Sequence, residues 1–434
     1  MISYFKIISL LVLFISVLLD YKIYQYVAIF LIIPIYLNGF KINSRLERLL
    51  LPIPILFYLK KLFSAITQNY EIWNSTTLNG YESIFPDMQA TLLQIKCQSK
   101  IDGFTFNNLE YLNNECIFHE VRYGPLFNVL KIDLNESFFN YIYILISILV
   151  FLFVLKIYKT SGLDLIFIYL LVLSPSFNLM FNQLNIDIIL IIFSYFFVKN
   201  IDSNFYAKTL LILIFALIKQ HPIGFLIGLV FLEVDRNKKR YLYSLIGLFF
   251  IIYGYFVYID NNFIYGQPRP SSMSNSIGLL SVSEYVWVNL TNSIYAYRVV
   301  FIIYFIFFLI SLAISKYYFK PLIIENNLVL TKFELASASW LLFCLIYANY
   351  DYRLVISFLF INLVKYLKIY KFSLVFLIYL SPFMTFENII INNIQIYGKI
   401  FLFFIVLQIL IRMNTNLLKD NSNNFISKCY RYLS

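Results

Sequence analysis

The chain has 434 residues, of which 61% are hydrophobic and only 13% are charged, and its formal net charge is +11. A mean hydropathy of +0.76 over this length excludes a water-soluble globular protein and predicts a polytopic membrane protein. Excess Lys and Arg in such a protein belong to cytoplasmic loops, so the net charge does not indicate a nucleic-acid partner.

Apolar stretches of spanning or near-spanning length recur along the whole chain. Because bilayer hydrocarbon offers no partner for backbone N–H and C=O groups, we expect each stretch to be a helix. The predicted spans are 4–19, 23–38, 49–67, 139–155, 164–178, 184–198, 207–219, 221–232, 241–258, 299–315, 333–348, 354–366, 372–386 and 399–411. The predicted fold class is therefore an all-α polytopic membrane protein, a bundle of about 12–14 transmembrane helices.

The positive residues orient these spans. With the N-terminus inside, most Lys and Arg lie on the cytoplasmic side, and the short outer loops hold only Lys22, Lys219, Arg353 and Lys399. The predicted segments are then N-terminal helices at 1–67, a first outer loop at 68–138, helices at 139–258, a second outer loop at 259–298, helices at 299–411 and a cytoplasmic tail at 412–434. This orientation predicts a multi-pass protein of the plasma (inner) membrane with its site on the outer, periplasmic face.

The two outer loops differ in composition. The first is acidic and moderately apolar, and we expect it to form short helices on the membrane surface. The second has Gly, Pro and Ser around 266–272, which is typical of a flexible loop. Cys97 and Cys116 both lie in the first loop, and an oxidising compartment permits a disulfide between them. Two unpaired thiols are the alternative interpretation.

Residues 178–222 are predicted to form a helical hairpin whose two polar ends return to the outer face. The first end, Asn182 to Asp187, opens an apolar helix, and Gln183 and Asp187 are expected to share one face of it. An acid such as Asp187 inside the bilayer boundary is costly and usually functional. The second end is Lys219 to Pro222. Hydrogen bonding between helices and snorkelling to headgroups are the structural alternatives for the two ends.

Three further polar groups are predicted on the same face. Glu82 and Asp87 lie in the first outer loop, where a carboxylate acts as a general base or is an ordinary solvated acid. Residues 122–127 form a rigid turn or a plain helix start with Pro near its first position. At 351–353, the arginine either offers a bidentate fork to phosphate or forms a salt bridge with the neighbouring aspartate.

These groups meet on a side of the membrane that has lipid but no nucleotides. The chain also has neither a GxxxxGK[ST] motif nor a Rossmann fingerprint. A donor substrate there must be carried by lipid, and an acid combined with cationic phosphate ligands fits transfer from a lipid phosphate.

The order of the motifs resembles the GT-C superfamily of membrane glycosyltransferases. The motifs are an outer-loop acid, Tyr-x-Pro-Leu at 123–126, Asn-Gln-x-Asn at 182–185, Lys-Gln-x-Pro at 219–222 and Tyr-Asp-Tyr-Arg-Leu at 350–354. Within the superfamily the chain is most similar to glycosyltransferase family 87, whose known members are polyprenol-phosphate-mannose-dependent α-mannosyltransferases. The resemblance runs from 87 to 353, and three predicted spans precede the acid where the family usually has one.

The family pattern places Asp87 at the catalytic acid, and Glu82 stays the rival because no D-x-D pair lies near Asp87. Tyr123 falls in the Tyr-Pro-Pro-Leu-like turn. Lys219 matches a lysine often followed by proline, although two residues intervene here. The Asp-Tyr-Arg of some relatives matches Asp351, Tyr352 and Arg353.

The same pattern covers the polar ends of the hairpin. Gln183 and Asn185 match a Gly-Gln-x-Asn mouth, in which Asn182 takes the place of the glycine. We expect Asn182, Gln183 and Asp187 to bind sugar hydroxyl groups or to orient the phosphate ligands. Asn185 and His221 complete the predicted substrate-binding set on this hairpin.

The resemblance implies a hexosyltransferase that moves a sugar, with mannose as the first guess, from a polyprenyl-phosphate donor to a lipid-linked or glycan acceptor, with inversion. Asp87 would deprotonate the acceptor. Lys219 and Arg353 would hold the leaving phosphate, with Asp351 beside them, and Tyr352 would stack on the sugar. We expect membrane lipids as partners and no cofactor, and a divalent metal requirement stays open. The alternatives are a polysaccharide polymerase, a lipid-linked sugar flippase, or a structural protein of the envelope.

Overall fold

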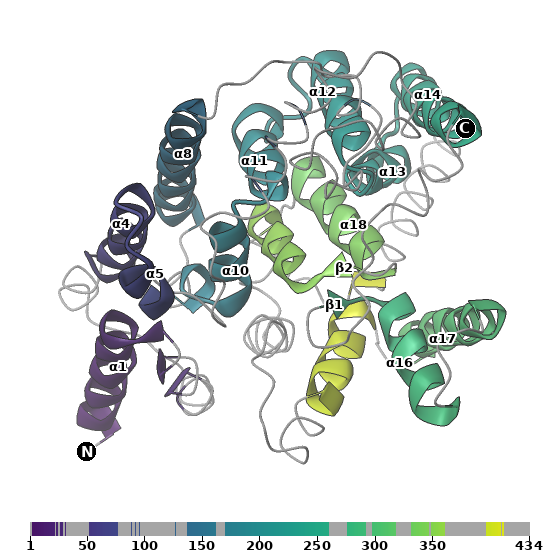
Figure 1. Ribbon diagram of the computed structural model, residues 1–434. Coiled ribbons are helices and arrows are strands. Elements are labelled where there is room, and N and C mark those ends of the chain that lie inside the picture. The colour runs from purple at the N-terminus through teal and green to yellow at the C-terminus, as the bar shows by residue number, and fades with distance from the viewer. Residues whose placement is uncertain are drawn as a thin grey trace, which may run out of the picture.

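The structure is a computed structural model that describes residues 2–21, 52–76, 137–161, 170–259, 276–291, 297–317, 331–346, 349–360, 396–408 and 410–411, and the single residues 23, 24, 27, 28, 31, 88, 92, 95 and 126. Within these residues the chain is almost wholly helical, as the apolar stretches predicted (Figure 1). The helices are α1 (Ile2–Leu19), α4 (Pro52–Ile66), α5 (Tyr70–Thr76), α8 (Ser137–Ser161), α10 (Pro175–Gln183), α11 (Ile186–Phe193), α12 (Phe205–Ile218), α13 (Ile223–Leu232), α14 (Arg236–Ile259), α16 (Leu279–Thr291), α17 (Tyr297–Tyr317) and α18 (Lys332–Ile346), with a π-helical segment η2 (Ser194–Val198) and a 3-10 segment η3 (Asp351–Phe360). A further helix spans Ile396–Gln408.

One described helix, Phe138–Ile157 within α8, is long and apolar enough to cross a bilayer. The pair Pro175–Asn182 and Ile186–Val198 passes the same criterion only if it counts as one span, and it bends by 110° at its break. The apolar helices Phe205–Ile218 and Ile223–Leu232 are shorter than a straight span requires. Beyond these one or two candidates in the described part of the chain, the spans inferred from the sequence stay predictions.

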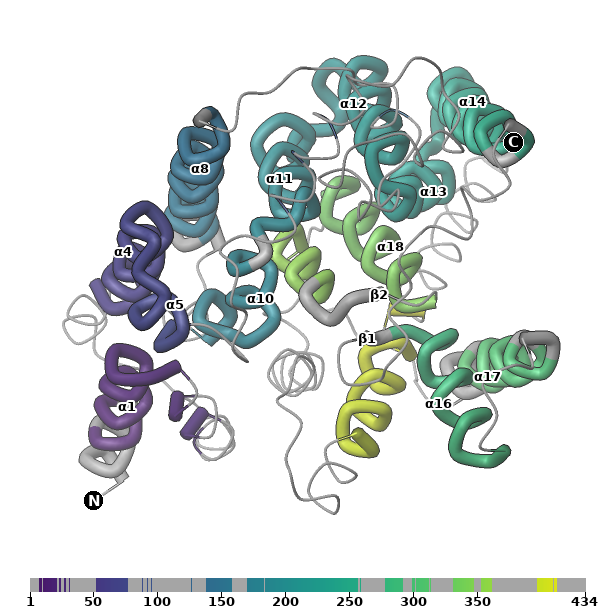
Figure 2. The backbone as a smooth tube through the Cα atoms, viewed as in Figure 1, coloured from purple at the N-terminus to yellow at the C-terminus, as the bar shows by residue number. Residues whose placement is uncertain are grey.

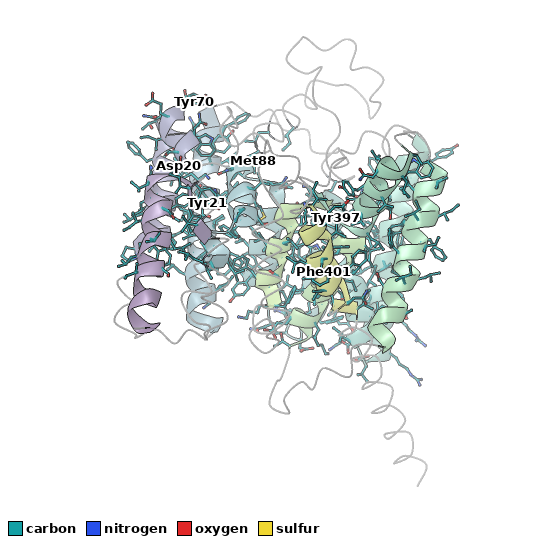
Figure 3. The ribbon with its side chains drawn as sticks, turned by 90° about the horizontal axis from the view of Figure 1, so that it is seen from below. Asp20, Tyr21, Tyr70, Met88, Tyr397 and Phe401 are labelled. Carbon is teal, nitrogen blue, oxygen red and sulfur yellow. The ribbon has the colours of Figure 1, made fainter. Side chains whose placement is uncertain are left out.

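Large apolar side chains cover the outward faces of the long helices. Ile15 on α1, Tyr141 on α8, Ile251 on α14 and Phe305 on α17 are each more than half exposed. Figure 3 shows such side chains projecting from the long helices, with Asp20 and Tyr70 lying toward the same end of the molecule. Water-soluble monomers rarely expose apolar surface on this scale, so these faces require an apolar environment or a partner.

The predicted hairpin is present. The segment α11–η2 runs away from the polar mouth, a turn at 199–204 reverses the chain, and α12 returns to Lys219 (Figure 2). Asn204, whose φ is +54°, adopts the left-handed conformation that this turn requires just before α12. Asparagine tolerates this conformation better than most residues, which explains its place at the end of the turn.

Two predictions about the helices around the mouth are wrong. The span predicted at 164–178 is broken, because Ser174 caps a new helix that begins at Pro175, its Oγ accepting from the N–H of Phe177 at 3.3 Å. Gln183 and Asp187 do not share a helix face, because Leu184 between them has φ +45° and ends α10. Spacing alone cannot show such a break.

The second outer loop contains a helix that was not predicted, whereas its stretch at 266–272, predicted to be flexible, lies outside the described residues. This helix is α16, whose buried residues Leu279, Leu280 and Val282 lie in its first turn. The polar residues Ser281, Ser283 and Glu284 interrupt this apolar run, which is why it fell short of the length expected of a span. In the first outer loop, the short helix α5 agrees with the expectation of short helices there.

A pair of two-residue strands joins the second outer loop to the segment before η3. β1 (Ser276–Ile277) and β2 (Asn349–Tyr350) are antiparallel, with Ser276 opposite Tyr350 and Ile277 opposite Asn349. Gly278 follows β1 with φ +148°, a conformation that glycine adopts without steric cost. The pair thus lies directly before the segment that carries Arg353.

Helices α13 and α18 approach each other closely at two glycines. A Cβ atom at Gly224 would lie 2.6 Å from Cβ of Phe343 and 3.1 Å from Cα of Trp340. A Cβ atom at Gly228 would lie 2.6 Å from Cβ of Ser339. This glycine spacing of four allows helix backbones to pack at short range, as in membrane helix pairs. It sets the distance between the start of α13 and the middle of α18.

An ion-pair network joins three turns at the other end of the hairpin. Nζ of Lys332 lies 2.9 Å from Oδ1 of Asp202 and 3.1 Å from Oε2 of Glu233. Partial burial alone would lower the pKa of Lys332, but hydrogen bonds and charge attraction from the two carboxylates raise it above its ordinary value. The predicted topology places all three residues on the cytoplasmic side.

Candidate functional site

Four ionisable side chains from separate elements meet at the polar ends of the hairpin. Asp187 stands in the first turn of α11, Lys219 caps the end of α12, His221 lies in the turn before α13, and Arg353 is the third residue of η3. We call these four residues the Asp187 cluster. In Figure 1, α11, α13, α18 and the unlabelled η3 come together in the middle of the molecule.

Backbone geometry fixes the position of Asp187. The N–H of Leu184 donates to the carbonyl of Phe181 at 3.1 Å, and the N–H of Asn185 donates to that of Met180 at 3.4 Å. These two bonds are the Schellman pattern that ends a helix at a left-handed residue. Asn185 then caps α11, its Oδ1 accepting from the N–H of Asp187 at 3.1 Å. The carboxylate therefore starts a helix at a sharp corner.

The carboxylate of Asp187 is the hub of the cluster. Its Oδ1 lies 3.0 Å from Nε2 of His221 and 3.2 Å from Nζ of Lys219, and its Oδ2 accepts from Nε of Arg353 at 3.0 Å. The side chain is 1% exposed. A buried carboxylate surrounded by three donors is stabilised as the anion and has little capacity to take a proton. Asp187 is thus suited to orienting cations rather than to acting as a base.

Trp340 fixes the protonation state of His221. Its indole N–H donates to Nδ1 of His221 at 2.7 Å, and the two rings stack with centroids 5.7 Å apart. Because an indole N–H can only donate, Nδ1 must be an unprotonated acceptor. The imidazole proton therefore sits on Nε2, where it is donated to Asp187. A neutral His221 leaves two cations facing one carboxylate, so the cluster is net positive.

The two cations lie at the rim of the cluster. The side chain of Arg353 is 13% exposed and that of Lys219 is 9% exposed, whereas Asp187 lies beneath them. Lys219 also donates to Oδ1 of Asn185 at 2.9 Å, which ties the cation to the cap of α11. Arg353 and Lys219 are thus the cationic groups that the cluster presents nearest to its surface.

The structure thus brings together five of the residues singled out in the sequence, namely Asn185, Asp187, Lys219, His221 and Arg353. It gives Arg353 a partner that the sequence did not suggest, because Asp187 lies on a helix far away in the chain. Asn182 is buried near the end of α10. For Gln183, Asp351 and Tyr352 the backbone is described, but the side chains lie outside the described part.

The remaining predicted residues fall outside the described residues. These are Glu82 and Asp87, Tyr123, and the pair Cys97 and Cys116. The catalytic acid, the turn residue and the disulfide therefore stay predictions. Met88 and Leu92 are described as helical and buried, and so is Ile95.

The first outer loop reaches the Asp187 cluster through Ile95. This side chain packs with Ile186, next to Asp187, and Ile218, next to Lys219, packs against the pair. Met88, which follows the predicted acid Asp87 in the sequence, belongs to the main hydrophobic core. The loop that carries the predicted acid thus contacts both helix ends that carry the cluster.

A second polar network, which sequence reasoning missed, surrounds Lys61 of α4. Its ammonium is fully buried, donates to the carbonyl of Thr76 at 3.0 Å and to Oδ1 of Asn178, and lies 5.2 Å from the ring centroid of Trp73. Asn178 closes the triangle, its Nδ2 donating to the same carbonyl at 3.1 Å. The only signal in the sequence was the Lys60-Lys61 pair within a predicted span.

The contact of Trp340 with His221 was not predicted from the sequence, since a tryptophan within an apolar span carries no distinctive pattern. Within the described residues, no group of three or more His, Cys, Asp or Glu side chains is arranged to hold a metal ion. No protein-family model, no curated protein and no solved structure matches this chain.

Proposed function

We propose that the chain is a multi-pass membrane glycosyltransferase. It moves a hexose, mannose as the first candidate, from a polyprenyl phosphate to a lipid-linked or glycan acceptor on the outer face, with inversion. The observation that carries the proposal is the convergence of Lys219 and Arg353 on the buried carboxylate of Asp187. This arrangement supplies two oriented cations at a rim that a lipid phosphate can approach.

Membrane insertion is supported by two observations. The helix Phe138–Ile157 has the length and apolarity of a span. The long helices also expose large apolar side chains on their outward faces, which lipid would cover. The outer-face position of the cluster rests on the Lys and Arg distribution in the sequence. The polytopic bundle of the GT-C type is part of the same proposal.

The phosphate is the leaving group, and its negative charge grows as the sugar bond breaks. A cation accelerates this step only if it holds that charge more tightly than the ground state. Asp187 fixes Arg353 through Nε and Lys219 through Nζ, so neither cation has to be reoriented during the reaction. His221, held neutral by Trp340, adds a third fixed contact to Asp187 without adding charge.

The acceptor hydroxyl needs a base. Asp187 does not suit this role, because its carboxylate is already bound by His221, Lys219 and Arg353. We assign this role to Asp87, with Glu82 as the alternative, and Tyr352 to stacking on the sugar. The packing of Ile95 against Ile186 supports a position of the first outer loop near the leaving phosphate. No cofactor enters this scheme, and a metal requirement is a matter for experiment.

The test measures transfer by the purified full chain in lipid nanodiscs, with a short-chain polyprenyl-phosphate mannose as donor. Arg353→Lys keeps the charge but loses the planar fork, and we expect kcat to fall by about 10- to 100-fold. Lys208→Gln, on a half-buried lysine at the opposite end of α12, is the matched control and should leave kcat unchanged. Asp87→Asn and Glu82→Gln identify the base, and only one of them should abolish transfer.

A double substitution separates the phosphate clamp from simple charge neutralisation. If Arg353 only compensates Asp187, then Asp187→Asn combined with Arg353→Gln should restore the activity that Arg353→Gln loses. The proposal predicts no rescue, because the phosphate itself needs the guanidinium. Rescue refutes the clamp. Movement of a lipid-linked sugar across vesicles without transfer identifies a flippase and refutes the enzyme.

A further inference from the structure

Two asparagines one turn apart on α10 have opposite surroundings. Asn178 is 0% exposed and both ends of its amide are bonded, Oδ1 to Lys61 and Nδ2 to the carbonyl of Thr76. Asn182 is 1% exposed, and neither Oδ1 nor Nδ2 has a hydrogen-bond partner in the described structure. The amide of Asn178 is thus fully hydrogen-bonded, whereas the amide of Asn182 on the same helix is not.

An unbonded amide in a protein interior is energetically unfavourable. A buried donor or acceptor without a partner loses its hydration and gains nothing in return. Native proteins leave few such groups, and each one calls for an explanation, such as a ligand or an ordered water. Asn182 carries one donor group and one acceptor group in this condition, so its ligand must both donate and accept.

The position of Asn182 connects it with the Asp187 cluster. It stands three positions before Asn185, whose Oδ1 accepts from Lys219 at 2.9 Å. Three peptide units span at most about 11 Å between Cα atoms. The chain bends by 110° between α10 and α11 at Leu184. Asn182 lies near the end of α10 and Asp187 near the start of α11, on the two sides of this bend. A sugar and its anomeric phosphate can bridge this distance.

We propose that the amide of Asn182 binds two neighbouring hydroxyl groups of the transferred sugar, and this inference rests on the proposed function. In a vicinal diol one hydroxyl donates to Oδ1 while the other accepts from Nδ2, which satisfies both ends of the amide at once. The phosphate of the same donor lies at Lys219 and Arg353. Asn182 then selects sugars by their hydroxyl pattern, while the cluster selects for the phosphate.

The first experiment is a thermodynamic cycle that combines a substitution in the protein with removal of one hydroxyl group from the donor sugar. Asn182→Leu preserves the size of the side chain and removes its hydrogen bonding. We expect kcat/KM with polyprenyl-phosphate mannose to fall by about 10- to 100-fold, and one monodeoxy donor to show a similar loss with the wild-type chain. In Asn182→Leu that deoxy donor should be no worse than the full donor. Asn178→Leu is the matched control, and it should lower the melting temperature without changing the preference between donors.

A binding measurement keeps the inference testable without turnover. Calorimetry compares short-chain polyprenyl-phosphate mannose with the same polyprenyl phosphate lacking the sugar. The wild-type chain should bind the sugar-bearing lipid more tightly, and Asn182→Leu should bind the two equally. If the difference persists in Asn182→Leu, or if that variant only gains stability, the inference is overturned and the amide holds an internal water. If neither lipid binds the wild-type chain, the phosphate site itself fails, and the inference fails with it.

Discussion

Substitution of Gly224 by alanine tests whether the contact between α13 and α18 sets the geometry of the Asp187 cluster. The new Cβ would lie 2.6 Å from Cβ of Phe343, whereas ordinary contact begins at 3.4 Å. The two helices must therefore separate by about 0.8 Å at this turn, since both partners are close to the backbone. Gly224 also adjoins Trp340, whose Cα would lie 3.1 Å from the added atom.

The separation acts directly on the bond that fixes His221. The indole N–H of Trp340 now lies 2.7 Å from Nδ1 of His221, and a displacement of about 0.8 Å would lengthen this distance beyond a normal hydrogen bond. Overpacking of this kind costs about 1–3 kcal/mol of stability, offset in part by the helix preference of alanine. Misplacement of a clamp by this amount reduces turnover by roughly 10- to 100-fold.

The assay combines the melting temperature of the full chain in detergent with transfer from polyprenyl-phosphate mannose. Gly247→Ala in α14 is the matched control, because no atom lies within 4 Å of its added Cβ. That variant should be as stable as the wild type or slightly more so, with unchanged turnover. If Gly224→Ala behaves like Gly247→Ala in both measurements, the close contact does not position the cluster and the reasoning is wrong.

Three further predictions follow from the polar contacts. Trp340→Phe removes the donor to Nδ1 of His221 but leaves the bond from Nε2 to Asp187, so ¹⁵N spectra of histidine in a His119→Gln background should show a shift of the Nδ1 resonance of His221; an unchanged resonance contradicts the assignment. Lys61→Met keeps the length of the side chain and breaks the bonds to Thr76 and Asn178, and the melting temperature should fall. Lys60→Met, on a half-buried neighbour whose bond to the carbonyl of Leu18 is long at 3.4 Å, should lower it much less. Lys332→Met removes two ion pairs. Because folding raises the pKa of Lys332, this stabilisation is fully present below the ordinary lysine pKa and is lost as pH rises through the raised pKa of the folded state. The difference in melting temperature from the wild type should therefore persist at neutral pH and vanish in strong alkali.

The sequence was most informative where apolar length decides the structure. The span predicted at 139–155 lies within α8, and those at 207–219 and 221–232 match α12 and α13 to within two residues. The hairpin, and with it the approach of Asp187 to Lys219, follows from two apolar helices joined by a short turn. The break between α10 and α11 could not be predicted from apolar length. It depends on the left-handed φ of Leu184, a conformation that leucine does not indicate. A glycine or asparagine at that position would have indicated the corner.

Contacts between distant elements were also beyond sequence pattern. Arg353 finds Asp187 across 166 positions of the chain, and Lys61 finds Asn178 across 117. Both pairs are set by how the helices cross, which hydrophobic periodicity does not specify. The bond between Trp340 and His221 depends on the close approach at Gly224, and the Gly224 to Gly228 spacing is the one pattern that would have predicted it.

The strand pair β1–β2 has a mechanical consequence. Backbone hydrogen bonds hold the register of Ser276 and Tyr350, so a shift of one strand along its axis drags the other. Tyr350 stands three residues before Arg353, with the first turn of η3 between them. We therefore expect a displacement of β1 in the second outer loop to shift the start of η3, which carries Arg353. A molecule that binds this loop and displaces β1 would move Arg353 relative to Asp187. Binding at the loop and binding of an anion at Arg353 would then affect each other.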